Sequence, residues 1–265
     1  MQMATCIAAK ADDPKLIELF IAHGADVNKL SSYSNTGIFG QRASMKYSPL
    51  FVAVKFASPK CVRTLLNAGA TVTEAIIYPS SEQTETLLNS IVIRPKEKNE
   101  PHHVREAINL ELMKILIEQG KADVNQVVIR FEEQADSKKP PHKGRETVLH
   151  QAVLLGQTAV ARFLIDSGAD VTIPWQCDDF PPLSLFEIHT SPIWKGKAAI
   201  WVWRNVASLW RPELHRHFPQ SFRAIVGTLL LCLVRFSVQM PKELLIPLIH
   251  KLAIQSTPPG YKRVK

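Results

Sequence analysis

The chain has 265 residues, of which 46% are hydrophobic, and a formal net charge of +8. This size and apolar content allow one or two domains with a buried core. The longest apolar run, from Ala224 to Val234, is too short to cross a bilayer, so we expect no contact with a membrane. We also expect no secretory signal, because MQMATCIAAK lacks an adequate apolar run.

The basic excess lies at the C-terminal end. Residues 1–180 contain 20 Lys and Arg against 21 Asp and Glu, whereas residues 181–265 contain 12 against 3. These cations stand singly among apolar residues, so we do not expect a nucleic-acid partner. The four cysteines include no C-x-x-C pair, which argues against zinc sites and disulfides. A reduced compartment, cytoplasmic or nuclear, fits best.

The first helical pattern runs over residues 4–28. Leu16, Leu19 and Phe20 recur at the spacing of one helical face, and Ala8-Ala9 precede them. Gly24 then permits the positive φ that a helix C-terminus needs. We therefore expect two short helices that end in the sequence GADVN.

Two further units follow at residues 48–73 and 86–125. The first has Pro49 at its first helical position and Gly69 at its turn. The second is interrupted by RPKEKNEPHHVREAIN, from Arg94 to Asn109, and has an extra residue, Lys121, in its turn. Because this insertion is charged and broken by Pro, we expect it to project into solvent.

Long loops separate the units. Residues 31–44 are rich in Ser, Gly and Asn, and either a disordered loop or a recognition loop fits that composition. In the loop from Gln126 to Arg145, Val127, Ile129 and Phe131 predict a strand-like finger. A basic tip from Lys138 to Arg145 follows it.

The fourth unit, Thr147 to Thr172, is the most regular. It reads TVLHQAVLLGQTAVARFLIDSGADVT, two apolar helical patterns joined by one Gly and ended by another. Its Thr147, Leu149, His150 and Ala152 fall on the T-P-L-H-x-A start of the ankyrin repeat, which it resembles. The resemblance implies that His150 bonds backbone in a neighbouring loop. The equivalent positions hold Cys6, Phe51 and Asn89, which implies less regular loops there.

Each helix is too short to be stable alone and has one apolar stripe to bury. The resemblance therefore implies an all-α ankyrin solenoid over residues 1–180, with repeats at about 4–28, 48–73, 86–125 and 147–172. Residues 181–210 fit a degenerate fifth unit, with PPLSLFEIHT as its first helix and Ala198–Trp210 as its second. The density of Trp in this segment is typical of domain packing.

A C-terminal module is predicted at residues 211–255, followed by a basic tail at 256–265. Its helices are expected at Pro212–His217, Phe222–Phe236 and Pro241–Ile254, with a kink at Pro247. The module loosely resembles a SOCS box or an F-box, through Leu231-Cys232 and Met240-Pro241. Thr228 and Leu233 depart from the SOCS pattern. A plain cap on the last repeat is the alternative.

The resemblance implies a protein partner bound by inner helices and finger loops, with candidate contacts at Tyr47, Phe51, Phe56, Arg130 and Phe131. The alternative is a ubiquitin-ligase adaptor that holds elongin or Skp1-type subunits through Leu229, Cys232, Pro241, Leu244 and Leu245. We expect no catalysis, cofactor or metal, since no phosphate loop, G-x-S-x-G or H-E-x-x-H occurs. His215 and His217 point to different helix faces and do not converge.

Overall fold

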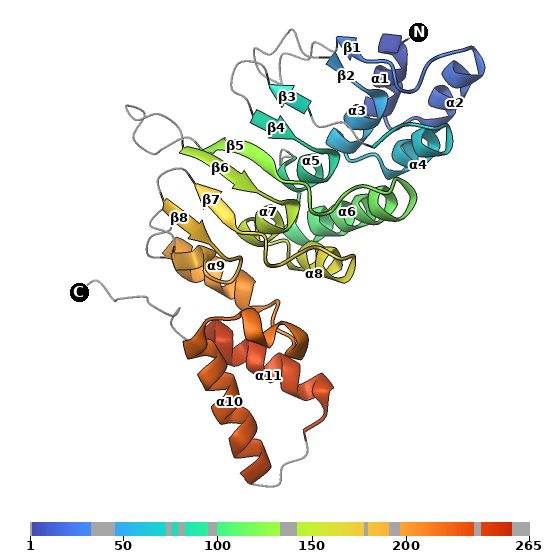
Figure 1. The fold of residues 1–265 in the computed structure, drawn as a ribbon. Coiled ribbons are helices and arrows are strands. Elements are labelled where there is room, and N and C mark those ends of the chain that lie inside the picture. Colours follow the sequence, from blue (N-terminus) through green and yellow to red (C-terminus); the bar gives the residue numbers. More distant parts are fainter. Residues whose placement is uncertain are drawn as a thin grey trace.

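Four helical hairpins stack in a row in the computed structural model, which describes residues 2–32, 46–72, 76–78, 83–94, 100–132, 142–177, 180–190, 197–235 and 240–255. The hairpins, called units one to four, are α1 (Gln2–Lys10) with α2 (Pro14–Ala22), α3 (Pro49–Lys55) with α4 (Pro59–Asn67), α5 (Leu87–Ile93) with α6 (His102–Lys114), and α7 (Val148–Leu154) with α8 (Thr158–Asp166). The first helices form an inner layer and the second helices an outer layer (Figure 1).

Local chemistry sets the ends of these short helices. Ser48 Oγ accepts a hydrogen bond from the Phe51 amide at 3.2 Å, and Thr86 Oγ1 accepts one from the Asn89 amide at 3.2 Å. These side chains satisfy amide groups that a helix start leaves free. Glycines with φ of 84°, 87° and 93° follow the outer helices of units one, two and four, at Gly24, Gly69 and Gly168.

The expectation of an all-α fold is wrong, because the loops between units pair as antiparallel hairpins. These are β1 (Ser31–Ser32) with β2 (Lys46–Tyr47), β3 (Ile76–Tyr78) with β4 (Gln83–Glu85), β5 (Val128–Glu132) with β6 (His142–Glu146), and β7 (Trp175–Cys177) with β8 (Phe180–Leu183). Strands β5-β6-β7-β8 form one four-stranded sheet. Two extended segments that leave and re-enter the stack side by side satisfy their backbone groups by pairing.

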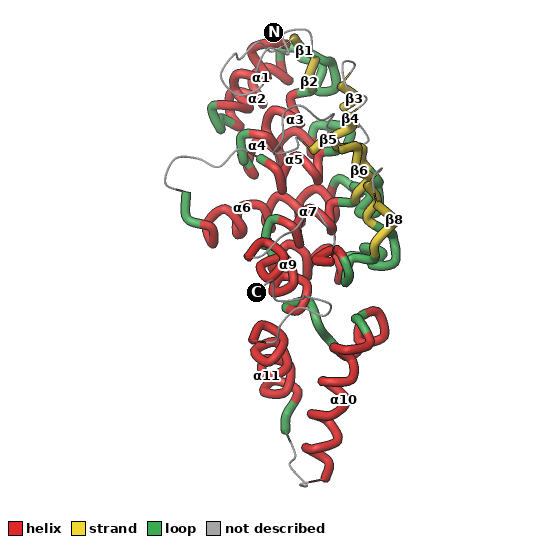
Figure 2. Tube along the Cα trace, turned by 90° about the vertical axis from the view of Figure 1, so that its left-hand side faces the viewer, coloured by secondary structure: helices red, strands yellow, loops and turns green. Residues whose placement is uncertain are grey.

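These hairpins, called fingers, follow one side of the stack (Figure 2). The predicted strand around Val127 to Phe131 is confirmed by β5, in which Phe131 lies opposite Lys143 of β6. Residues 133–141, most of the predicted basic tip, lie outside the described part of the chain. The same holds for residues 33–45, so the two alternatives for the first loop stay open there.

Unit three corrects the expected insertion. Helix α6 begins at His102, so the second half of the segment from Arg94 to Asn109 is helix rather than a projecting loop. Both ends are buried, with Arg94 3% exposed and Asn109 fully buried. Residues 95–99 lie outside the described part. The charges that predicted exposure instead bond to each other inside the protein, as shown below.

The predicted fifth unit is also corrected. Residues 180–190 form β8 and a 3-10 turn, Ile188–Thr190, instead of a first helix. Pro181 and Pro182 lack amide hydrogens, which disfavours a helix but is tolerated in an edge strand. Helix α9 (Lys197–Ala207) packs on α7 and so occupies the inner layer, the place of a first helix.

The C-terminal module has the three expected helices: a 3-10 helix at Pro212–His217, α10 (Gln220–Arg235) and α11 (Lys242–Gln255). Helix α11 continues through Pro247 without a break. Aromatic rings join the module to the stack, with the Trp203 and Phe222 centroids 5.5 Å apart and those of Phe186 and Phe218 4.4 Å apart. The tail at 256–265 lies outside the described part.

A hydrogen bond from a side chain to the preceding inner helix occurs at three places along the stack. Ser58 Oγ donates to the Ala9 carbonyl at 3.2 Å, and Gln157 Nε2 donates to the Val92 carbonyl at 3.0 Å. Asn205 Nδ2 in α9 donates to the Val153 carbonyl at 3.0 Å. Each carbonyl lies in the last turn of the preceding inner helix, where carbonyl groups lack an amide partner within the helix. Among the described residues, no helix is long and apolar enough to span a membrane.

Candidate functional site

A buried ion pair holds the finger of unit three against unit two. Lys55 Nζ, at the end of α3, lies 2.9 Å from Glu85 Oε1 in β4, and the Glu85 side chain is 4% exposed. Ser90 Oγ donates a second bond to Glu85 at 2.7 Å. Because a buried carboxylate is costly unless it is paired and hydrogen-bonded, these contacts fix one position for the finger.

A second network does the same for the finger of unit four. Gln151 Nε2 donates to Glu146 Oε1 at 2.7 Å, and Arg130 Nη1 lies 3.6 Å from the same oxygen. Gln151 Oε1 accepts a bond from Asn89 Nδ2 of unit three at 2.9 Å. The strands β5 and β6 are thereby tied to two successive inner helices.

His150 closes the start of α7. The Thr147 amide donates to its Nδ1 at 3.1 Å, so ring and backbone form a capping box. Burial lowers the pKa of His150 to about 4, although the backbone of Ile173 acts in the opposite direction. The imidazole is therefore neutral near pH 7 and serves the fold, and Asn89 occupies the same place in unit three.

Residues 145–175 match the family model of the ankyrin repeat. This segment is an ankyrin repeat. The match begins in β6, includes α7 and α8, and ends in β7, so both of its ends lie in the four-stranded sheet. No curated protein sequence matches the chain. Ankyrin repeats in general stack to present extended binding surfaces for proteins.

The structure places two of the sequence-predicted contacts inside unit two. Tyr47 is 1% and Phe51 2% exposed, and their rings stack with centroids 5.1 Å apart. Phe56 is half-buried, with Lys10 Nζ 5.2 Å from its ring. Tyr47 and Phe51 therefore offer little side-chain surface, whereas Phe56 retains some.

The other two predicted contacts lie on one strand of the four-stranded sheet. Arg130 keeps 30% of its side chain exposed beside Glu146. Phe131 is its neighbour in β5, and its side chain lies outside the described part. The sequence reasoning overlooked two exposed neighbours as contacts, Arg145 in β6 and Val127, the latter 46% exposed. Arg145 stands between buried Gly144 and Glu146, the alternation of a half-buried strand.

The predicted adaptor contacts are divided between surface and interior. Leu229 and Leu245 are partly buried against the core, while Pro241 is exposed and Leu244 is 62% exposed. Cys232 lies in α10, but its side chain is outside the described part. Beside it, Leu231 is 71% exposed.

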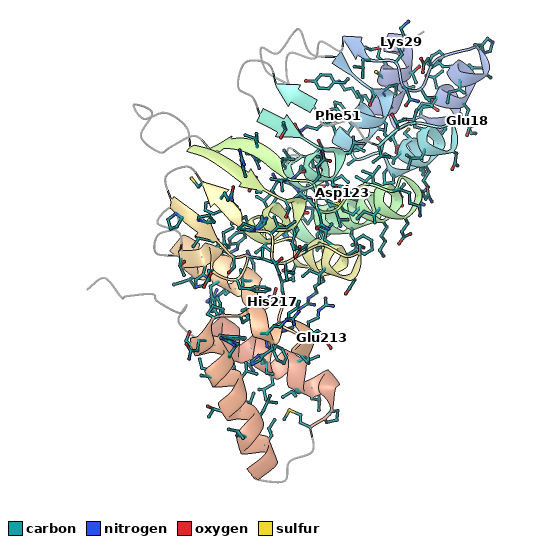
Figure 3. All side chains as sticks on the ribbon, viewed as in Figure 1. Glu18, Lys29, Phe51, Asp123, Glu213 and His217 are labelled. Atoms are coloured by element: carbon teal, nitrogen blue, oxygen red, sulfur yellow. The ribbon has the colours of Figure 1, made fainter. Side chains whose placement is uncertain are left out.

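The two histidines of the 3-10 helix are engaged in hydrogen bonds. His215 Nδ1 accepts from Trp210 Nε1 at 3.2 Å, and His217 Nε2 accepts from Arg216 Nε at 3.1 Å. Figure 3 shows His217 and Glu213 at the junction between the stack and the C-terminal helices. Within the described ranges, no three His, Cys, Asp or Glu side chains are placed to hold a metal ion.

Proposed function

We propose that this chain binds a protein partner through the exposed face of its fingers and inner helices, without catalysis. The observation that carries the proposal is the ankyrin repeat at residues 145–175, whose finger strands continue into a four-stranded sheet. Buried pairs at Glu85 and Glu146 support that surface from below. A surface fixed before binding loses little conformational entropy on association, which favours affinity.

Phe56, Arg130 and Phe131 are the proposed contacts, together with Arg145. Arg and aromatic side chains carry much of the binding energy at protein interfaces. Tyr47 and Phe51 contribute indirectly, because their stacked rings hold the finger of unit two on α3. We place the interaction in the cytoplasm or nucleus, where buried free thiols such as Cys6 and Cys61 stay reduced.

Affinity capture from native cell extract tests the proposal. The full chain, Arg145→Glu and a matched control, Lys60→Glu on the exposed surface of α4, are immobilised and the captured proteins are identified by mass spectrometry. We expect at least one protein that binds the full chain and the control but not Arg145→Glu. Identical capture by all three chains contradicts the proposed surface.

A ubiquitin-ligase adaptor is the second candidate, and the exposed leucines of the C-terminal helices favour it. Leu231 and Leu244 leave 71% and 62% of their surface in solvent, which is unusual for a plain cap. Purified elongin and Skp1-type subunits are titrated into the chain and into Leu244→Asp. Binding that only the unaltered chain shows supports the adaptor, and no binding to either chain excludes these subunits.

We also propose the division of the chain that these functions need. Residues 1–180 form the binding stack and residues 181–210 the junction. Residues 211–255 form the separate C-terminal module. Limited proteolysis tests this division, with first cleavage expected close to residues 181 and 211 rather than within the helices.

A further inference from the structure

The extended outer helix of unit three builds a feature that the other units lack. Helix α6 has 13 residues, whereas α2, α4 and α8 have 9 each. Asn109 and Gln157 are equivalent positions, because each lies eleven residues before the turn glycine of its unit. Gln157 precedes helix α8, whereas Asn109 lies inside helix α6. Residues 102–108 are thus extra helix, and Figure 2 shows α6 on the side opposite the strands.

This extra helix, which we call the ledge (residues 102–108), is held in place by contacts of the residues that flank it and of its own Glu106. Arg94 pairs with Glu100 at 2.5 Å, and Arg94 Nε donates to Asn109 Oδ1 at 2.8 Å. Glu106 Oε1 accepts from the Ala159 amide at 2.6 Å and so caps α8, whose own N-cap residue, Gln157, makes no side-chain capping bond. The ledge is therefore tied to its own unit and to unit four.

A pocket of about 100 Å³ opens between the ledge and the turn that joins α7 to α8, lined by His102, Arg105, Glu106, Leu155 and Gln157. Sites for drug-sized ligands measure roughly 300–1,000 Å³. This pocket is several times smaller, so it suits a single side chain rather than a cofactor. It also lies away from the fingers, on a different surface from the proposed contacts at Arg130 and Arg145.

The charges around the pocket favour an anionic group. Arg105 forms no ion pair among the described residues. Its Nη2 donates to the carbonyl oxygens of Arg94 and Val92, and its Nε is buried without a hydrogen-bond partner there. Burial, the largest cause, and the charge of Arg94 lower the pKa of Arg105, while the charge of Glu100 acts in the opposite direction. The two acids nearby are engaged, Glu100 with Arg94 and Glu106 with the start of α8.

Apolar surface adjoins the pocket. Leu155, which lines it, is 42% exposed, and Trp201 of α9 is 44% exposed. The ring of Trp201 lies directly on Gly156, where an added Cβ would be 2.7 Å from Trp201 Cζ2. Trp and Arg are the residues most enriched at the energetic centres of interfaces. A guanidinium that has no carboxylate partner among the described residues, close to an exposed Leu and Trp, matches that composition.

We infer that the ledge is a second docking site, which takes a peptide segment of a partner protein with an Asp or Glu close to an apolar residue. The carboxylate enters the pocket and bonds Arg105 and His102. The apolar side chain lies on Leu155 and Trp201. Binding here does not depend on the fingers, so the inference stands apart from the proposed function.

Selection of phage-displayed random dodecapeptides on the full chain tests the inference. Recovered peptides are synthesised, and their affinity is measured by fluorescence anisotropy for the full chain, Leu155→Glu and His102→Glu. The matched control is Leu19→Glu, which changes a 52% exposed leucine on α2. Both substitutions at the pocket are at exposed positions, and thermal unfolding checks that each variant folds.

We expect recovered peptides in which Asp or Glu lies within a few residues of Trp, Phe or Leu. Leu155→Glu is expected to weaken them by at least about tenfold, the effect of losing one good interface contact, and Leu19→Glu to leave them unchanged. Arg145→Glu in the finger should also leave them unchanged. Peptides without an acid, peptides that bind Leu155→Glu equally well, or the recovery of no peptide would overturn the inference.

Discussion

Units three and four have the same architecture but reach it by different means. Unit four matches the ankyrin repeat model, begins with a capping box at Thr147 and His150, and ends on Gly168 with φ of 93°. Unit three has Asn89 where unit four has His150, and its outer helix is four residues longer and ends in a π-helical turn. Both hairpins nevertheless occupy equivalent places in the stack.

The difference shows that contacts between units hold the stack where local sequence is irregular. Asn109 Nδ2 of unit three donates to Gln157 Oε1 of unit four at 2.7 Å, and Gln157 donates back to the Val92 carbonyl of unit three. Both side chains are buried. Solenoid stability is the sum of repeat terms and neighbour terms, and here the neighbour terms sustain the weaker repeat.

The substitution with the largest expected effect on stability removes the buried charge of Arg94 in unit three. Arg94→Met should lower the free energy of unfolding by about 3–5 kcal/mol, because it removes the ion-pair partner of Glu100 and the hydrogen-bond donor of Asn109 Oδ1. Urea unfolding followed by circular dichroism measures the change.

Arg63→Met is the matched control for that substitution. Arg63 pairs with Glu111 at 3.1 Å, but the two side chains are 46% and 50% exposed, so its loss should cost less than about 1 kcal/mol. Equal effects of the two substitutions would show that the buried pair does not support unit three.

The second test uses pH to separate the two capping residues. The pKa of His150 is about 4 in the folded protein, against 6.5 when unfolded, so on acidification the unfolded state takes up the proton first. Stability should therefore fall as pH drops from about 7 to about 4, by roughly 3 kcal/mol from this residue.

His150→Asn, which copies Asn89, isolates that contribution. The variant should lose about 3 kcal/mol less than the unaltered chain between these pH values, because the carboxylates common to both cancel. Chemical unfolding at several pH values gives the difference. Parallel pH profiles would mean that His150 is protonated as readily in the folded protein as in the unfolded chain.

The sequence predicted the helical hairpins and missed what their loops do. Helical spacing and turn glycines depend on neighbouring residues, so Leu16 to Gly24 and Thr147 to Gly168 could be assigned. Strand pairing joins Arg145 to Gln176 across a whole unit, and single-sequence periodicity does not reveal such a partner.

The candidate sites were harder to predict, for a related reason. An aromatic residue in a helix pattern gives no sign of whether it faces core or solvent, and Phe51 proved buried. The charged residues around Arg94 predicted an exposed loop, but Arg94 is buried and paired with Glu100. The sequence contains Glu100 but does not indicate this pairing. The ledge pocket depends on the meeting of two segments about 50 residues apart in the sequence, which no local pattern indicates.

The substitution with the smallest expected effect on stability concerns the extra residue in unit three. Lys121 has φ of 56°, which disfavours a side chain, while Gly120 is at −81°. A π-helical turn at Ile115–Gln119 takes up the added residue, as such turns do. Lys121→Gly should stabilise the chain by about 0.5–1 kcal/mol, by removing the strain of the left-handed backbone.

Gly168→Ala is the opposite substitution in unit four. Open space surrounds an added Cβ at Gly168, so only its φ of 93° opposes the change, and a loss of about 1 kcal/mol is expected. Thermal unfolding of both variants measures the pair. Destabilisation by Lys121→Gly would show that the lysine is not strained.

Native-state hydrogen exchange compares units three and four most directly. Backbone amides of α6 should be protected to within about tenfold of those in α8, because the buried contacts through Asn109 and Gln157 make the two units open together. Exchange in α6 at the rate of an unfolded peptide, beside a protected α8, would contradict the account that contacts between units sustain the irregular repeat.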